Sequence, residues 1–336
     1  MEFGSDFHKI GYPNGNGLPY GIFNHYVSGR QPLLDIVLSS DYNCIWIPSY
    51  YCGESLSILK RSNIKIKRYK CLPTDNPDKS VENLPLEPDD LLLRINFFGI
   101  HGFHHSNRYP CDVIEDHTHD LISEWALESN AQWCFASIRK TLPTADGGIL
   151  WSPIGNSLPL QCSRTPMVAN SIALRYSAME VKAEYLKGGQ LNKESFLQAF
   201  KDTEECFDTF SLSDWSSTTN EITSSINLEY WYKLKKANYT KLLSELDFRN
   251  SAPIMINIGE STPFSLIILF HSNAQRENAR SYLIRNDVYP AILWQDVYKL
   301  DSDAIDFSKR MLSIHCDGRY SEKDMHVLAQ ILNHVI

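Results

Sequence analysis

The first half of the chain alternates short apolar runs with amphipathic segments. Residues 44–48 (CIWIP) form a wholly apolar run, which is typical of a buried strand. Residues 53–63 carry apolar side chains at helical spacing, and residues 64–69 (IKIKRY) alternate between apolar and charged, as a strand does. Further strand-like runs occur at 91–99, 111–116, 133–137 and 147–152. Strands that alternate with helices predict an α/β domain with a largely parallel sheet flanked by helices.

The second half of the chain has a different pattern. Residues 165–206 are patterned as helix, residues 211–225 are rich in serine and threonine and predict a loop or hinge, and residues 228–246 predict a long amphipathic helix. The remaining predicted elements are a strand at 264–270 and helices near 273–286 and 321–335. We therefore predict a large α/β domain at 1–225 and a smaller α+β domain at 226–336.

Composition places the chain among ordinary globular proteins. Of its 336 residues, 43% are hydrophobic and 21% are charged, and the formal net charge is −8. No cluster of Lys and Arg forms a patch for phosphate backbones, so we do not expect nucleic acid as a partner. No apolar run approaches the roughly 20 residues of a membrane-spanning helix, so we expect no membrane association.

The number and spacing of the cysteines indicate whether the protein belongs to a reducing or an oxidising compartment. The eight cysteines are scattered along the chain without a CxxC pair. This usage is typical of reduced thiols, and not of a disulfide framework or a zinc site. The first residues also lack the basic and apolar regions of a signal peptide, so we expect a cytoplasmic protein.

The segment FASIRKTLPTADGG contains the candidate for the central chemistry. An apolar strand ends at Ser137, and Lys140 follows three residues later. Loops after the strands of a parallel sheet gather at one edge, where such sheets bind ligands. Lys140 could be an ordinary exposed cation, as most lysines are. Alternatively, its amine in a desolvated pocket would be a nucleophile that holds a cofactor as a Schiff base, with the Ser137 hydroxyl at a phosphate.

Two earlier loops offer groups that would accompany such a lysine. Ser28 and Gly29 precede a helical pattern; a helix N-terminus favours phosphate, glycine allows close backbone approach, and Arg30 adds charge. The same residues would also serve as an ordinary helix cap. Tyr50 and Tyr51 follow the run at 44–48, where a ring can stack on a flat heterocycle or pack against the core.

The segment VIEDHTHD delivers acidic and imidazole side chains to the same edge. Asp116 at the strand end can pair with the protonated ring nitrogen of pyridoxal phosphate, which keeps the ring an electron sink. His117 and His119 have a metal-ligand spacing, so a metal hydrolase is a competing interpretation. Possible further ligands precede them at His101, His104, His105 and Cys111. Because Asp120 comes one position too early for the HxHxDH pattern of hydrolases, we expect no metal.

The order of these motifs resembles the large domain of fold-type I pyridoxal phosphate enzymes. Among them, the chain is similar to the sugar aminotransferases of the DegT/DnrJ/StrS type, in a divergent branch. SGRQPL resembles SGRxAL, PSYYC resembles PSYxC, NFFG resembles a short aromatic–glycine strand end, IEDHTH resembles IEDxxH/Q, and SIRKTLPTADGG resembles SLRKxxPxxDGG. The resemblance covers most of residues 4–152, and NYTKLL and CDGRYSEKDM extend it loosely into the second half.

The resemblance implies a role for each matched residue. Lys140 would bind the cofactor covalently and move the proton, Asp116 would pair with the pyridine nitrogen, and His119 would contact the phenolic oxygen. The residues expected at the phosphate are Ser28, Gly29, Arg30 and Ser137, and the ring would stack on Tyr50 or Tyr51. The usual dimer of the family implies a homodimer.

We therefore predict a pyridoxal-phosphate-dependent aminotransferase that converts a nucleotide-linked keto-sugar to an amino sugar in a polysaccharide pathway. Glutamate or glutamine would donate the amino group. The alternative is a non-catalytic cofactor-binding or sugar-binding protein with a regulatory role. Residues of the small domain that could reach a substrate carboxylate or diphosphate, or could equally be surface or core residues, are Arg285, Trp294, His315 and Arg319.

Overall fold

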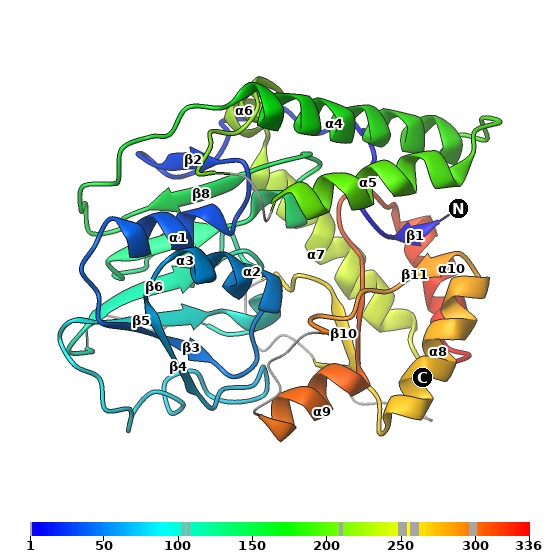
Figure 1. Ribbon diagram of the computed structural model, residues 1–336. Helices are drawn as coiled ribbons and strands as arrows, with labels where there is room; N and C mark the ends of the chain where they lie inside the picture. The colour runs from blue at the N-terminus through cyan, green and yellow to red at the C-terminus, as the bar shows by residue number, and fades with distance from the viewer. Residues whose placement is uncertain are drawn as a thin grey trace.

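The computed structural model describes residues 2–102, 105, 108–207, 211–247, 254–255, 262–295 and 301–336. Figure 1 shows a large part built around a central sheet and a smaller part packed beside it, with both chain ends on the side of the smaller part. None of the described helices is long and apolar enough to cross a membrane.

A seven-stranded sheet forms the centre of the large part, in the order β2-β8-β7-β6-β5-β3-β4. The strands are β2 (Asn24–Tyr26), β3 (Cys44–Pro48), β4 (Lys65–Tyr69), β5 (Asp90–Ile95), β6 (Asp112–Asp116), β7 (Trp133–Ala136) and β8 (Gly148–Trp151). Pairings among β3 to β7 are parallel, whereas β8 is antiparallel to β7 and to β2. β3, β5 and β7 are buried along their whole length, as their apolar sequences predict. The largely parallel sheet is therefore confirmed.

Helices flank this sheet. The short ones are α1 (Gln31–Leu38), α2 (Gly53–Ser57) and α3 (Glu124–Leu127), with 3₁₀ turns at Ile58–Arg61, Phe97–Gly99 and Ile138–Lys140. In Figure 1, α1 and α2 lie in front of the sheet. The predicted helical stretch 165–206 is confirmed as α4 (Pro166–Leu186) and α5 (Lys193–Phe207), which pack as an antiparallel pair along the top of the view.

Residues 217–225 form helix α6 (Ser217–Ser225), so the prediction of a loop over 211–225 was wrong for this part. The carboxylate of Asp146 accepts hydrogen bonds from the backbone N–H of Ser216 at 2.7 Å and from the Thr219 hydroxyl. The Ser216 hydroxyl in turn caps the helix by accepting from the N–H of Thr219. Buried contacts made by Asp146 thus stabilise a helix that the polar sequence does not favour.

The smaller part is an α+β unit. A three-stranded antiparallel sheet, in the order β12-β10-β9, consists of β9 (Ile254–Met255), β10 (Leu266–Leu269) and β12 (Met311–Ile314). Its helices are α7 (Leu228–Glu245), α8 (Asn273–Arg285), α9 (Ser302–Arg310) and α10 (Glu322–Leu332). A short parallel pair joins β1 (Phe3–Gly4) to β11 (Val288–Tyr289). The N-terminal strand therefore packs with the C-terminal part.

Two apolar cores underlie this arrangement. The first surrounds the central sheet and includes Trp231 of α7, while the second fills the smaller part and includes Phe3 from the N-terminus. The boundary between residues 225 and 226 stays a prediction, since α7 contributes side chains to both cores.

Candidate functional site

Lys140 lies where two cavities meet, beyond the end of β7. Ser137 follows the strand, and the 3₁₀ turn Ile138–Lys140 carries the lysine to the cavities. Its side chain is accessible from these cavities, although protein atoms surround it deeply. The neighbouring cation of Arg139, together with burial, lowers the pKa of Lys140. A larger share of its amine is therefore unprotonated and nucleophilic than in an ordinary lysine.

The first cavity, of about 430 Å³, gathers most of the predicted site. The predicted residues that line it are Ser28, Gly29, Arg30, Asp116, His119, Ser137 and Lys140. They come from the loop before α1, the end of β6 and the segment after β7. The sheet topology thus brings together side chains that are more than 100 residues apart in the sequence.

The loop at Ser28 packs against the lysine segment through backbone contacts. Ser28 forms a β-bridge with Gly147, and a Cβ added at Gly29 would lie 2.4 Å from the Cβ of Ser137, so this approach requires glycine. Helix α1 begins at Gln31, and no side chain caps its N-terminus. The Ser28 hydroxyl is buried and has no hydrogen-bond partner among the described residues. This arrangement fits an anionic ligand such as phosphate.

Asp116 ends β6, and its two carboxylate oxygens accept different hydrogen bonds. Oδ1 accepts from the backbone N–H of Thr118 at 2.9 Å, and Oδ2 accepts from the hydroxyl of Tyr51 at 2.6 Å. Burial raises the pKa of Asp116 above its usual value, because these hydrogen bonds compensate only in part for lost hydration. A carboxylate in such an environment favours a cationic partner, such as a protonated ring nitrogen.

The two tyrosines are placed differently from the expected stacking role. Tyr51 directs its hydroxyl to the strand-end carboxylate, and the Tyr50 ring is buried against Phe97, Phe307 and Trp294. Neither tyrosine lines the cavity. The strand end turns both rings into the aromatic cluster behind the cavity wall, and Trp294 is the side chain of that cluster that lines the cavity.

His119 presents a neutral ring to the first cavity. Its Nδ1 accepts a 3.1 Å hydrogen bond from the backbone N–H of Phe98, so the proton of the neutral ring is on Nε2. The ring stacks with Phe98 and with Trp294, with centroids 5.7 Å and 5.8 Å away. Burial lowers the pKa of His119 to about 3, which keeps the ring uncharged. His119 can therefore donate one hydrogen bond from Nε2 to a ligand oxygen.

The residues considered for substrate contacts divide into three groups. Trp294 lines the first cavity, whereas His315 and Arg319 line the second. Arg285 lines a separate cavity that shares no residue with either, so it is not placed to contact a substrate at Lys140. Arg319 donates from Nε and Nη2 to the two oxygens of Asp317, both at 2.9 Å, and from Nη1 to the carbonyl oxygen of Ser5. It therefore supports the cavity wall.

Glu204 of α5 is a site residue that the sequence analysis did not single out. Its Oε1 accepts hydrogen bonds from Nη2 of Arg139 at 2.7 Å and from Nη2 of Arg30 at 2.9 Å, and Nη2 of Arg175 lies 3.5 Å from Oε2. Burial alone would raise the pKa of Glu204, but the surrounding cations hold it well below its usual range. Within the sequence, Glu204 is one of two adjacent glutamates in a helix, and nothing local marks it.

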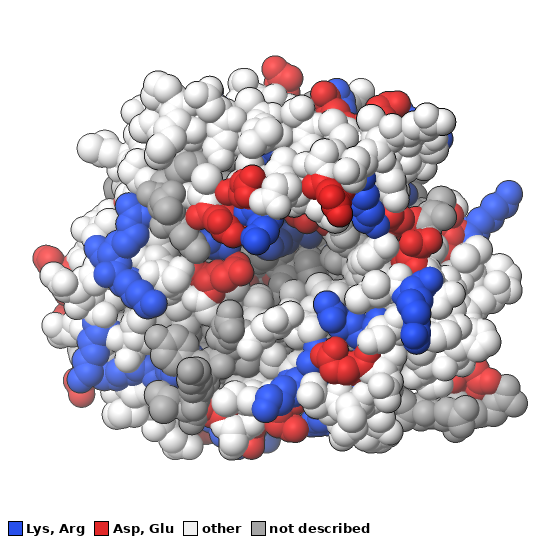
Figure 2. All heavy atoms as spheres, turned by 45° about the vertical axis from the view of Figure 1, so that its right-hand side comes forward, with Lys and Arg blue, Asp and Glu red and all other residues white. Residues whose placement is uncertain are grey.

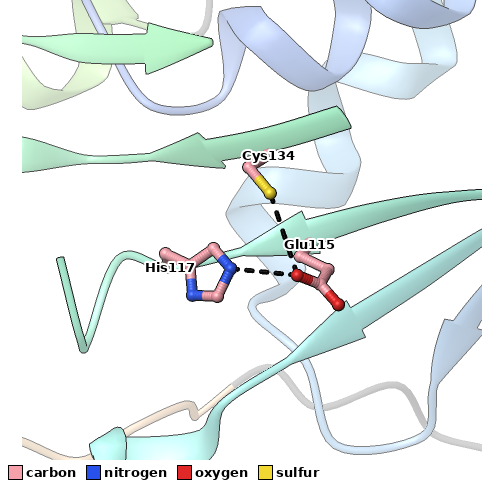
Figure 3. A group of neighbouring side chains, drawn as sticks. All are labelled: Glu115, His117 and Cys134. Atoms are coloured by element: carbon pink, nitrogen blue, oxygen red, sulfur yellow. Dashed lines mark hydrogen bonds and ion pairs between the residues drawn. The ribbon is translucent and has the colours of Figure 1, made fainter. Parts of the chain in front are cut away.

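His117 does not share a site with His119. Figure 3 shows the His117 ring directed at Glu115, with Nε2 3.2 Å from Oε2, and the thiol of Cys134 donating to the same oxygen. These three buried side chains are the one group of metal-ligating types within 4.8 Å of one another in the described part of the chain. His119 instead lines the cavity, so the paired-histidine metal site is not formed. His104 lies outside the described residues.

Comparison with known proteins supports the fold. No protein-family model and no curated protein sequence matches the chain. Solved structures do match it. Spr1654 of Streptococcus pneumoniae, described as a sugar aminotransferase and solved in its PMP form, has a TM-score of 0.63 at 9% identity, and the match covers 100% of this chain and 98% of that chain.

Two further structures belong to the same class. PseC of Helicobacter pylori, an aminotransferase involved in the biosynthesis of pseudoaminic acid, gives a TM-score of 0.63 at 10% identity and covers 100% of this chain and 99% of its own. DesI, solved in the presence of its TDP-sugar product, gives a TM-score of 0.56 at 10% identity, and the match covers 94% of this chain and 80% of that chain. The chain thus has the fold of these aminotransferases, and the predicted fold-type I architecture is confirmed.

Proposed function

We propose that the chain is a pyridoxal-phosphate-dependent aminotransferase that converts a nucleotide-linked keto-sugar to an amino sugar. Glutamate or glutamine would lose its amino group and become the corresponding 2-oxo acid, while the keto carbon of the sugar gains that group. The observation that carries the proposal is the position of Lys140, an accessible amine of lowered pKa between two cavities. DesI has the same fold and was solved in the presence of its TDP-sugar product, which supports a nucleotide-linked sugar as the substrate class of this chain.

The residues of the first cavity fit the cofactor. The unpartnered hydroxyl of Ser28 and the uncapped start of α1 suit a phosphate, and Ser137 lies beside them. Asp116 suits a protonated pyridine nitrogen, and Nε2 of His119 suits a phenolic oxygen. The fit therefore rests on three kinds of group, each matched to a different part of the cofactor.

These residues would divide the work of the reaction. Pyridoxal phosphate, when bound, supplies an electron sink that stabilises negative charge on the carbon next to an amino group. Lys140 would hold the cofactor through its Nζ. The same nitrogen, when it is not bonded to the cofactor, would take up the proton from the carbon that bears the amino group. Asp116 would keep the ring nitrogen protonated, and His119 would orient the ring by donating from Nε2. Trp294 and Phe264, which line the cavity, would exclude water from it.

The oligomeric state, the domain boundary, the cellular compartment and the pathway are proposed from the sequence and the family resemblance. We propose a homodimer in which each chain folds as two domains, at 1–225 and 226–336. The resemblance also favours a cytoplasmic enzyme of polysaccharide biosynthesis.

Amino-group transfer tests the function directly. The protein, supplied with pyridoxal phosphate, is incubated with a TDP-linked keto-sugar and either glutamate or glutamine, and mass spectrometry follows the amino sugar and the 2-oxo acid. We expect both products in equal amounts from the wild type and from Lys187→Ala, which alters an exposed lysine. We expect neither from Lys140→Ala. Equal turnover by Lys140→Ala would contradict the proposed role of this lysine.

A further inference from the structure

The second cavity, of about 330 Å³, adjoins the first at Lys140. The two cavities share Arg139, Lys140, Phe264 and Leu293. The charged side chains that line the second cavity are Asp6, Arg139, Lys140, Arg175 and Arg319, so cations outnumber the single acid. Figure 2 shows a hollow in the face of the molecule with basic and acidic side chains gathered along its edge. The charge of the lining favours an anionic ligand.

Arg139 is the arginine of this lining with donors left to offer. The guanidinium of Arg319 is paired with Asp317, and Arg175 donates to Asp6, at 2.8 Å, and to the carbonyl oxygen of Phe200, at 3.0 Å. Arg139 is only 9% exposed, and its Nε has no hydrogen-bond partner among the described residues. Since a buried guanidinium N–H without an acceptor is costly, this group is ready for an acceptor that a ligand supplies.

The partner that Arg139 already has indicates the chemistry of that ligand. Nη2 of Arg139 donates to a carboxylate, that of Glu204, whose side chain is 29% exposed and therefore reachable by solvent. Carboxylates match the planar fork of an arginine, which can bind them through two parallel N–H donors. Arg30 and Arg175 also contact Glu204, but each has a further carboxylate partner, Glu54 at 2.7 Å and Asp6 at 2.8 Å. Among the described residues, Arg139 has Glu204 as its one carboxylate partner.

The position of Arg139 beside Lys140 adds a geometric argument. In an amino acid, the amine and the α-carboxylate are bonded to the same carbon. A donor whose nitrogen reacts at Lys140 must therefore place its carboxylate within a few ångströms, and Arg139 is the adjacent residue. This proximity distinguishes the donor carboxylate from the diphosphate of a sugar nucleotide, which lies several bonds from the reacting carbon.

We infer that the second cavity binds the α-carboxylate of the amino donor through Arg139, and that Glu204 is the internal carboxylate which the donor replaces as the partner of Arg139. This inference rests on the proposed function. It makes Arg139 a residue that selects amino acid donors, and Glu204 a residue that weakens their binding by competing for the same guanidinium.

Binding to the cofactor-free protein tests this inference. The probe is glutarate, which carries carboxylates but no amine, and isothermal titration calorimetry measures its dissociation constant. We expect Arg139→Gln to weaken glutarate binding at least about tenfold, because a charged hydrogen bond is lost. Arg139→Lys, which keeps the charge but not the fork, should also weaken it, by a smaller factor. Glu204→Gln should tighten it several-fold, and the matched control Glu205→Gln should not change it.

Equal glutarate affinity in the wild type, Arg139→Gln and Arg139→Lys would overturn the inference. So would tighter, Arg139-dependent binding of pyrophosphate than of glutarate, because that result would assign the arginine to a nucleotide diphosphate. A different result would contradict the proposed function. Absence of any Lys140-dependent cofactor binding would remove it even if glutarate still bound through Arg139.

Discussion

The hydroxyl of Tyr51 donates a 2.6 Å hydrogen bond to Oδ2 of Asp116. Tyr51 follows β3 and Asp116 ends β6, and these two strands are separated in the sheet by β5. The bond therefore ties two strand ends together at the edge where the cavity lies. Since Oδ1 accepts from the N–H of Thr118, both carboxylate oxygens are fixed. Tyr51 is thus a positioning residue for the carboxylate.

Replacing Tyr51 with Phe should weaken cofactor binding. The change removes the donor to a buried carboxylate, a loss of about 1.5–3 kcal/mol for a hydrogen bond to a charged group, so we expect a dissociation constant for pyridoxal phosphate at least about tenfold higher. Fluorescence titration of the cofactor-free protein measures it. Tyr50→Phe is the matched control, because the Tyr50 ring packs in the aromatic cluster. Equal weakening by both variants would show that aromatic packing, and not the bond to Asp116, matters.

Replacing Gly29 with Ala should destabilise the protein and impair cofactor binding. The added Cβ would lie 2.4 Å from the Cβ of Ser137, and separating these segments should cost about 1–3 kcal/mol of unfolding free energy. Urea denaturation measures the change. Gly21→Ala is the control, because a Cβ at Gly21 meets nothing within 4 Å. A Gly29→Ala protein as stable as Gly21→Ala would contradict the close approach.

The nucleophilicity of Lys140 should depend on its neighbour. Arg139 is the main cause of the lowered pKa of Lys140, so removal of this cation in Arg139→Gln should raise that pKa. The pH at which an amine-selective reagent labels Lys140 at half its maximal rate should therefore move upward in the variant. Peptide mass spectrometry across a pH series measures this rate. A midpoint that stays in place or moves downward would contradict the electrostatic account.

Protonated His117 should stabilise the fold in acid. Although burial disfavours the charged ring, Asp120 and Glu115 raise the pKa of His117 well above its usual value of 6.5. The resulting stabilisation is fully present below about pH 6.5 and is lost as the pH rises through the folded-state pKa. Hence the stability lost in His117→Gln should be largest below pH 6.5 and smaller in alkali. Urea midpoints at several pH values test this, and a loss that grows with pH would contradict it.

The parts of the site that the sequence predicts are those held by local strand ends. Asp116 follows an apolar run and Ser137 follows another, so parallel pairing alone brings them to one edge. Gly29 was predictable for a different reason, because glycine before a helix allows a close backbone approach. The direction of a side chain within such a loop was not predictable. Tyr50 and Tyr51 show this, because neither lines the cavity.

The parts that the sequence did not predict depend on how distant elements pack. Glu204 and Arg175 belong to α5 and α4, and only the packing of this helical pair beside the sheet brings them to Arg139. Helix α6 likewise forms where buried Asp146 anchors its first turn. Such long-range contacts override local propensity, which had favoured a loop.

The visible absorption spectrum of the protein with pyridoxal phosphate tests the central claim most directly. It is recorded before and after borohydride reduction for the wild type, Lys140→Ala and the control Lys187→Ala. We predict a visible band in the wild type and the control, which reduction converts to a covalent adduct that peptide mapping locates at Lys140, and no such band or adduct in Lys140→Ala. An adduct at another lysine, or none in the wild type, would contradict the assignment of Lys140.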